Sequence, residues 1–163
     1  MKKVLMGSLG IAGLAALVVA ATALATASFR VTTTMGPVQG TIEDDLNVKV
    51  KTGDWKVDVD TKGPSSLAVS EIHVAPGGYF GWHSHPGPSF VIVKSGTSTF
   101  YDGNDPDCTP QRHPAGTAYV DPGGDTHIAR NEGTVELVLY VTRLIPEGAA
   151  PRIDEPNPGN CPF

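Results

Sequence analysis

The fold is decided by two stretches, GGYFGWHSH at residues 77–85 and GTAYVDPGGDTHIARN at residues 116–131. Both stretches combine turn-forming glycines with histidines. Residues two apart in a strand project to the same face, so His83 and His85 can point at one common spot. His127 can reach that spot from a second strand. Three imidazoles that converge on one point predict a metal site.

The rest of the chain predicts short strands. Gly (19 residues) and Pro (14 residues) break the sequence into short pieces, and no convincing amphipathic helix follows residue 27. Apolar and polar residues alternate in 48–51 and 55–59, and Gly53-Asp54 between them predicts a hairpin. Further strands are expected at 29–41, 67–74, 89–94, 97–101, 117–120, 127–129 and 135–145. This pattern predicts an all-β sandwich or barrel whose mouth can hold a ligand.

Residues 1–27 have the composition of a secretory signal peptide. Met1-Lys2-Lys3 is basic, residues 4–25 are almost wholly apolar or small, and Ala25-Thr26-Ala27 has the small-x-small pattern of a cleavage site. We expect cleavage after Ala27, with Ala23-Leu24-Ala25 as an earlier alternative. An uncleaved membrane anchor is the other interpretation, because the apolar run approaches the roughly 20 residues that span a bilayer.

The charge balance is acidic, with 12 basic and 17 acidic residues. Removing residues 1–27 leaves roughly 136 residues, enough for one domain, with a net charge of about −7. The basic residues are scattered along the chain. This balance argues against nucleic acid or an anionic membrane as the main partner of the mature protein.

Cys108 and Cys161 predict a disulfide, because paired cysteines in an exported protein are normally oxidised. The bridge would tie the C-terminal tail to a loop in the middle of the domain. The loop-closure model gives roughly 4 kcal/mol of stabilisation for this span. Two metal-binding thiols are the alternative, but the cysteines lie far apart and lack a paired metal-ligand spacing.

The two quoted stretches resemble the two conserved motifs of the cupin superfamily. The first motif runs from Gly77 through His83 and His85 to Gly96. The second matches at every marked position: Gly116, Pro122, Gly124, His127 and Asn131. The two motifs at compatible spacing cover about a third of the chain and are far more specific than either alone. The resemblance implies a small single-domain, type-2-like cupin, whose double-stranded β-helix is a jelly-roll-like barrel. It also implies a metal held near one end by three His and one Glu.

Composition, strand pattern and resemblance together predict a division of the chain. Residues 1–27 are the signal peptide or anchor, 28–65 are N-terminal strands, 66–146 are the barrel core, and 147–163 are a Pro- and Gly-rich tail over the surface. On this basis we expect a secreted or extracytoplasmic protein.

Ser89 departs from the family pattern, because it stands where the first motif normally has Glu. Phe90 is the other residue that the spacing allows, and neither is a carboxylate. Ser89 has the same strand parity as His83 and His85 and can face the site. A hydroxyl is a poor ligand for a divalent metal. Three neutral imidazoles would leave the metal with its full positive charge and with an open position for water, hydroxide or an anion. The affinity of the site for the metal would be lower than with a carboxylate ligand. The alternative consequence of Ser in place of Glu is that the site binds no metal at all.

Four further residues are candidates for the pocket or its surroundings. Glu71 and His73 share a strand face and can supply a substitute ligand or orient a ligating imidazole, although such a pair is more often solvated. Trp82 and Tyr119 can line the pocket, although aromatic residues on barrel strands are more often core.

Three functions fit these observations. The first is metal-dependent chemistry on a small molecule, of oxygenase, isomerase or hydrolase type, with Zn, Fe, Mn, Ni or Cu as the divalent ion. The second is a non-catalytic extracytoplasmic module that binds a ligand or a metal. The third is a metal-free structural barrel. The resemblance is also compatible with a homodimer, but it assigns no catalytic residue, because cupins host many unrelated chemistries.

Overall fold

The computed structural model describes residues 24–163, so the expected signal peptide or anchor lies outside the described residues except for residues 24–27. The described residues contain no helix, and hence none that could cross a membrane. The strands are β1 (Phe29–Ile42), β2 (Asn47–Thr52), β3 (Trp55–Asp60), β4 (Ser65–Tyr79), β5 (His83–Ser84), β6 (Ser89–Ser95), β7 (Thr97–Asp102), β8 (Gln111–Pro114), β9 (Ala118–Asp121), β10 (His127–Arg130), β11 (Leu137–Pro146) and β12 (Ile153–Asp154).

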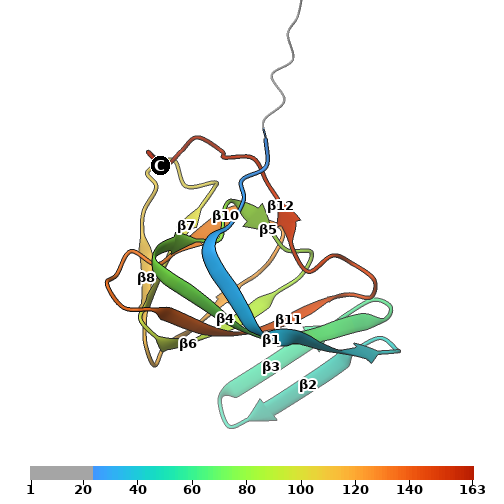
Figure 1. The fold of residues 1–163 in the computed structure, drawn as a ribbon. Coiled ribbons are helices and arrows are strands. Elements are labelled where there is room, and N and C mark those ends of the chain that lie inside the picture. The colour runs from blue at the N-terminus through green and yellow to red at the C-terminus, as the bar shows by residue number, and fades with distance from the viewer. Residues whose placement is uncertain (1–23) are drawn as a thin grey trace, which may run out of the picture.

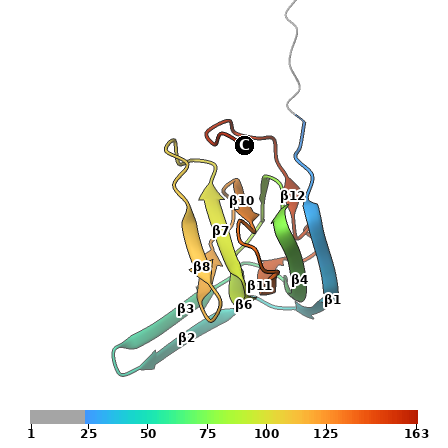
Figure 2. The ribbon, with the colours of Figure 1, turned by 60° about the vertical axis from the view of Figure 1, so that its left-hand side comes forward.

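Ten of these strands form one nearly closed barrel (Figure 1). One wall has the strand order β1-β4-β11-β6-β9, and the other has β12-β5-β10-β7-β8. The two walls join where Arg130 of β10 pairs with Tyr79 at the end of β4. Figure 2 shows β7 and β8 on one side of the barrel and β1 and β4 on the other. The all-β fold expected from the sequence is confirmed.

The core lies inside the barrel, on the inner face of β4, β6 and β11. Alternate residues of β4, β6 and β11 point inward and are buried, as the period of two requires. The buried cluster consists of Ile72, Val74, Val91, Val93, Leu137, Leu139 and Val141. Burying each such side chain stabilises the fold by about 1.5–3 kcal/mol relative to exposure. Four members of the cluster line the same cavity as the histidines: Ile72, Val91, Leu139 and Val141.

The strand pattern differs from the expected one in three places. Strand β4 continues through Pro76 and Gly77 to Tyr79. Strands β5 and β12 have two residues each and carry no periodicity that a sequence could reveal. Strand β8 ends in a proline and lies at the sheet edge beside β7, where a missing N–H is tolerated. The hairpin β2–β3 forms as expected, as a separate two-stranded sheet beside the barrel (Figure 1).

A disulfide and a strand pairing are among the contacts that hold the C-terminal tail against the barrel. Cys108 and Cys161 form the expected disulfide, with their Cα atoms 5.2 Å apart, which joins the β7–β8 loop to the tail. Cys161 is buried beside Trp82 and Tyr101. Further back, Ile153 of β12 pairs with Ser84 of β5. The tail therefore lies directly against the first histidine motif.

We expect no free thiol in the unfolded, unreduced protein, because both cysteines are in the bridge. The Cys108→Ser/Cys161→Ser double variant should lose about 2–4 kcal/mol of unfolding free energy, since the bridge closes a long loop in the unfolded chain. Thiol titration and denaturant unfolding measure the two effects. Two free thiols in the parent protein would refute the bridge, and reduction of the parent should reproduce the loss seen in the variant.

Candidate metal centre

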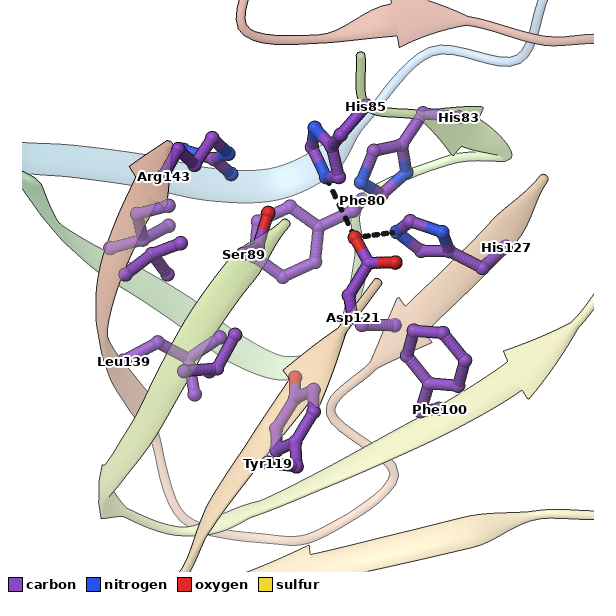
Figure 3. A pocket seen from close by; sticks show the side chains of 14 residues that line it. Phe80, His83, His85, Ser89, Phe100, Tyr119, Asp121, His127, Leu139 and Arg143 are labelled. Carbon is purple, nitrogen blue, oxygen red and sulfur yellow. Dashed lines mark ion pairs between the residues drawn. The ribbon is translucent and has the colours of Figure 1, made fainter. Parts of the chain in front are cut away.

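The barrel brings His83, His85 and His127 together in its interior. His83 in β5 pairs directly with His127 in β10, and His85 follows two residues after His83. Each histidine is almost fully buried. One ring nitrogen of each lies within 4.8 Å of the others, and Figure 3 shows the three rings turned toward one point. The convergence expected from the spacing is present.

Hydrogen bonds to backbone carbonyls hold the rings in place. The Nδ1 atoms contact the carbonyl oxygens of Gly81 for His83 (2.8 Å), Pro151 for His85 (2.6 Å) and Asp125 for His127 (3.1 Å). A carbonyl oxygen can only accept, so each Nδ1 carries the proton of its neutral ring. Each Nε2 therefore presents a lone pair, the form in which histidine binds a metal.

Burial keeps the three imidazoles neutral. It is the main cause that lowers the pKa of each ring, to about 3 for His85. Positive neighbours act in the same direction, with the Arg143 guanidinium the second cause for His85. At neutral pH no proton competes with a metal for these nitrogens.

The motif glycines shape the backbone around the histidines. Gly81, whose carbonyl holds His83, has a φ of +74°, and a Cβ there would collide with the Thr26 carbonyl oxygen. Gly123 has a φ of +82°, and its Cβ would lie 2.6 Å from the Gly87 carbonyl oxygen. Both positions require glycine, because other residues rarely adopt this conformation and here have no room for a side chain.

Asp121 lies beside the three histidines, although the sequence pattern did not predict it as a site residue. Its Oδ2 lies 3.7 Å from the Nε2 of His85 and 3.7 Å from the Nε2 of His127. Its Oδ1 accepts a hydrogen bond from the N–H of Gly123 (3.0 Å), whereas Oδ2 is buried without a hydrogen-bond partner. Asp121 stands just before Pro122, so it looks like a turn residue in the sequence. Asp121 lies two residues after Tyr119, a pocket candidate, so the two share a strand face. This shared face was the feature of the sequence that could have indicated a place in the pocket.

Ser89 faces the same cavity. It is 2% exposed, and its Oγ has no hydrogen-bond partner. Phe90, the other residue that the motif spacing allows, is 48% exposed on the outside of the barrel. Ser89 pairs across the strands with Asp121. The site thus has a carboxylate on the strand next to the one that the family pattern predicts.

The cavity around these groups is small. Its volume of about 40 Å³ holds roughly three water molecules. Phe80 and Phe100 form apolar parts of its wall. Tyr119 also lines it, with its hydroxyl 3.1 Å from the Ser98 Oγ, and burial raises the pKa of Tyr119 to about 12. The cavity can therefore admit an ion together with one small group of a ligand.

The remaining candidates lie elsewhere. The two ring nitrogens of His73 contact carboxylate oxygens of Glu71 and Glu136, each at 3.0 Å. Neither Glu71 nor His73 lines the cavity. Trp82 is buried beside Cys161 and also lies outside the cavity lining. Of the four additional sequence candidates, the structure brings Tyr119 to the histidines.

The donor set fits a metal ion. Three unprotonated nitrogens and one carboxylate oxygen, all buried, meet with no hydrogen-bond donor between Asp121 and the two imidazoles. Four acceptors that face one another need a cation or the hydrogens of water between them, and one divalent cation can satisfy all four at once. Imidazole and carboxylate are ligands that Zn and other divalent transition metals accept.

Comparison with known proteins places this site in a family. A family model described as a cupin domain matches residues 70–143. No curated protein matches the sequence. A Klebsiella pneumoniae protein with a double-stranded β-helix domain is 22% identical over 69% of this chain and 85% of its own, with a TM-score of 0.45. A cupin-like protein from Thermotoga maritima is 20% identical over 56% of this chain and 65% of its own (TM-score 0.47).

The DMSP lyase DddQ from Ruegeria pomeroyi is 21% identical over 52% of this chain and 41% of its own, with a TM-score of 0.45. These distant likenesses concern the fold alone. The family match covers both histidine motifs and the strands between them. With the barrel and the paired motifs, it identifies residues 70–143 as a domain of the cupin superfamily.

Proposed function

We propose that this cupin binds a divalent metal ion through His83, His85, His127 and Asp121 and uses it to hold a small molecule in the barrel. The observation that carries the proposal is the unpartnered Oδ2 of Asp121 between two Nε2 lone pairs. Asp121 would replace the Glu that the family pattern places at position 89. One carboxylate leaves a divalent ion with a net charge of about +1, which favours an oxygen-bearing or anionic ligand.

A bound metal of this kind supplies Lewis acidity to a ligand oxygen. The chain's own residues orient and shield the site. The carbonyls that accept from the three Nδ1 atoms fix the rings, and Phe80 and Phe100 limit the entry of water. These features support metal-dependent chemistry of oxygenase, isomerase or hydrolase type.

A non-catalytic binding module is the second candidate, and one observation favours it. Among the described residues that line the cavity, every histidine and carboxylate belongs to the proposed ligand set. Tyr119 is the remaining proton-bearing group of acidic character, and burial holds its pKa far above neutrality. A general acid or base would therefore have to come from the substrate or the metal-bound water.

Replacing His127 with Ala should lower the affinity for Zn²⁺ by more than about 100-fold, because it removes a ligand and not merely a supporting group. The barrel should still fold. Competition titration with a chromogenic chelator measures the affinity, and circular dichroism checks the fold. His73→Ala is the matched control, since His73 lies outside the cavity and should leave Zn²⁺ binding unchanged. Equal affinities in parent and His127→Ala would rule out the metal centre.

Replacing Asp121 with Asn should lower Zn²⁺ affinity by roughly 10–100-fold, by analogy with the loss of supporting groups at other metal sites. The amide oxygen can still accept from Gly123, so the turn should survive. Asp125→Asn is the matched control, because the Asp125 side chain lies on the exposed loop against Asn104. If both variants bind Zn²⁺ as the parent does, Asp121 is not a ligand.

We also propose that the protein is exported. The disulfide supports an oxidising compartment. Contacts of Thr26 favour the earlier of the two expected cleavage sites: its Oγ1 accepts from the N–H of Trp82, and its N–H donates to the Glu155 carbonyl oxygen. Cleavage after Ala25 keeps these contacts, whereas cleavage after Ala27 removes them.

Intact-mass measurement of the secreted protein should give a mature chain that begins at Thr26. A chain that begins at Ser28 would favour the later site and show that the Thr26 contacts are dispensable. Recovery of the uncleaved chain in the membrane fraction would support the anchor instead. Mutation of Ala25 to a bulky residue should block processing, since signal peptidases require small residues there.

A further inference from the structure

Arg143, Ser89 and Asp121 form a row across three neighbouring strands. Arg143 of β11 pairs with Ser89 of β6, and Ser89 pairs with Asp121 of β9. Directly opposed residues project to the same face of a sheet. All three line the cavity, and Figure 3 shows Ser89 between the other two. The row places a cation and an anion on either side of a small hydroxyl.

The guanidinium of Arg143 lacks an anionic partner within contact distance. No ion pair joins it to any residue in 24–163, and its Nε is buried without a hydrogen-bond acceptor. Burial lowers the pKa of Arg143, and the negative charge of Asp121 across the cavity opposes this shift. A metal ion bound to Asp121 would neutralise the negative charge of this carboxylate. Arg143 would then face the cavity with no counter-charge.

Ser89 provides a second unused polar group beside Arg143. Its Oγ is buried and has no partner. A Glu at this position would reach across to the guanidinium and neutralise it. The short Ser side chain instead leaves the space between Arg143 and the histidines open, with a hydroxyl that can donate to an acceptor placed there.

A larger pocket adjoins the metal cavity at Arg143. Its volume is about 270 Å³, and it shares Ile72, Phe80, His83 and Arg143 with the smaller cavity. Arg152 also lines it, but its guanidinium already contacts Asp154 and the Phe80 carbonyl oxygen. Arg143 is therefore the guanidinium positioned to bind an incoming group at the junction of the two spaces.

We propose that Arg143 and Ser89 form a subsite that binds the carboxylate of a small organic acid, whose body lies in the larger pocket. A planar guanidinium and a carboxylate pair through parallel hydrogen bonds, and the Ser89 hydroxyl adds one more. One guanidinium and one hydroxyl match a carboxylate better than phosphate, which has a third charged oxygen to satisfy. The subsite rests on the proposed function, because the proposed metal ion would lie next to the bound acid.

Propionate is the probe for this subsite, with its neutral analogue propionamide and inorganic phosphate for comparison. Ligand-observed NMR titration of the Zn²⁺-treated protein should show propionate binding at least about tenfold more tightly than propionamide, because the charge-assisted hydrogen bonds are lost with the amide. Arg143→Gln should lower propionate affinity by about tenfold or more, and Arg143→Lys by less. Arg112→Gln, on the exposed surface, should have no effect.

Ser89→Glu tests the subsite independently of any change at Arg143. The new carboxylate would occupy the place of the ligand, so propionate binding should be lost while Zn²⁺ is retained. Equal propionate affinity in the parent, Arg143→Gln and Ser89→Glu proteins would overturn the subsite, as would tighter binding of phosphate than of propionate.

Zinc content measured on the same samples separates this proposal from the metal centre. Propionate binding that depends on Arg143 in protein without zinc would support the subsite and refute the metal centre. If the protein retains zinc and its propionate affinity is unchanged by the Arg143 and Ser89 substitutions, the metal centre is supported and the subsite is refuted.

Discussion

The site depends on hydrogen bonds from three imidazole Nδ1 atoms to three backbone carbonyls. These carbonyls belong to segments far apart in the sequence: the turn before β5, the loop before β10 and the C-terminal tail. Each bond sets the tautomer and the direction of one ring. Without them, three buried histidines could turn their nitrogens to any nearby acceptor. Gly81 supplies one of these carbonyls from a turn with a φ of +74°, and the β5–β12 pairing places the segment just after Pro151 beside the first motif.

The location of the carboxylate shows how a barrel can redistribute charge without changing its backbone. Cross-strand neighbours occupy almost equivalent positions relative to the cavity. A carboxylate at Asp121 can therefore approach the histidines from β9 in place of one at position 89 on β6. The exchange also exposes Arg143, on the other side of Ser89, to the cavity. One row of the sheet thus combines a proposed metal ligand, open space and a cation.

The sequence predicted the all-β fold, the β2–β3 hairpin and the convergence of three histidines, because period-two alternation and turn residues are local signals. The disulfide was predicted from the presence of two cysteines in a chain with the composition of an exported protein. Asp121 could not be found in this way, since its role depends on which strand lies beside β6, and register between distant strands leaves no mark in one sequence. The carbonyl of Pro151 is equally hidden. Residues 147–163 have a composition typical of a surface tail, yet this segment holds one of the three rings.

The fastening of the tail has a consequence for when the site can form. The carbonyl that orients His85 lies ten residues before Cys161, and Cys161 is bound to the β7–β8 loop, at the far end of the wall that contains β5. In a reducing compartment the two thiols stay unbonded, and the last segment loses its covalent attachment while it keeps its hydrogen bonds to the barrel. His85 then has a less rigid partner, and the ligand cage is less preorganised. With the metal binding and the export proposed above, oxidation would act as a maturation step that couples metal loading to arrival outside the cytoplasm.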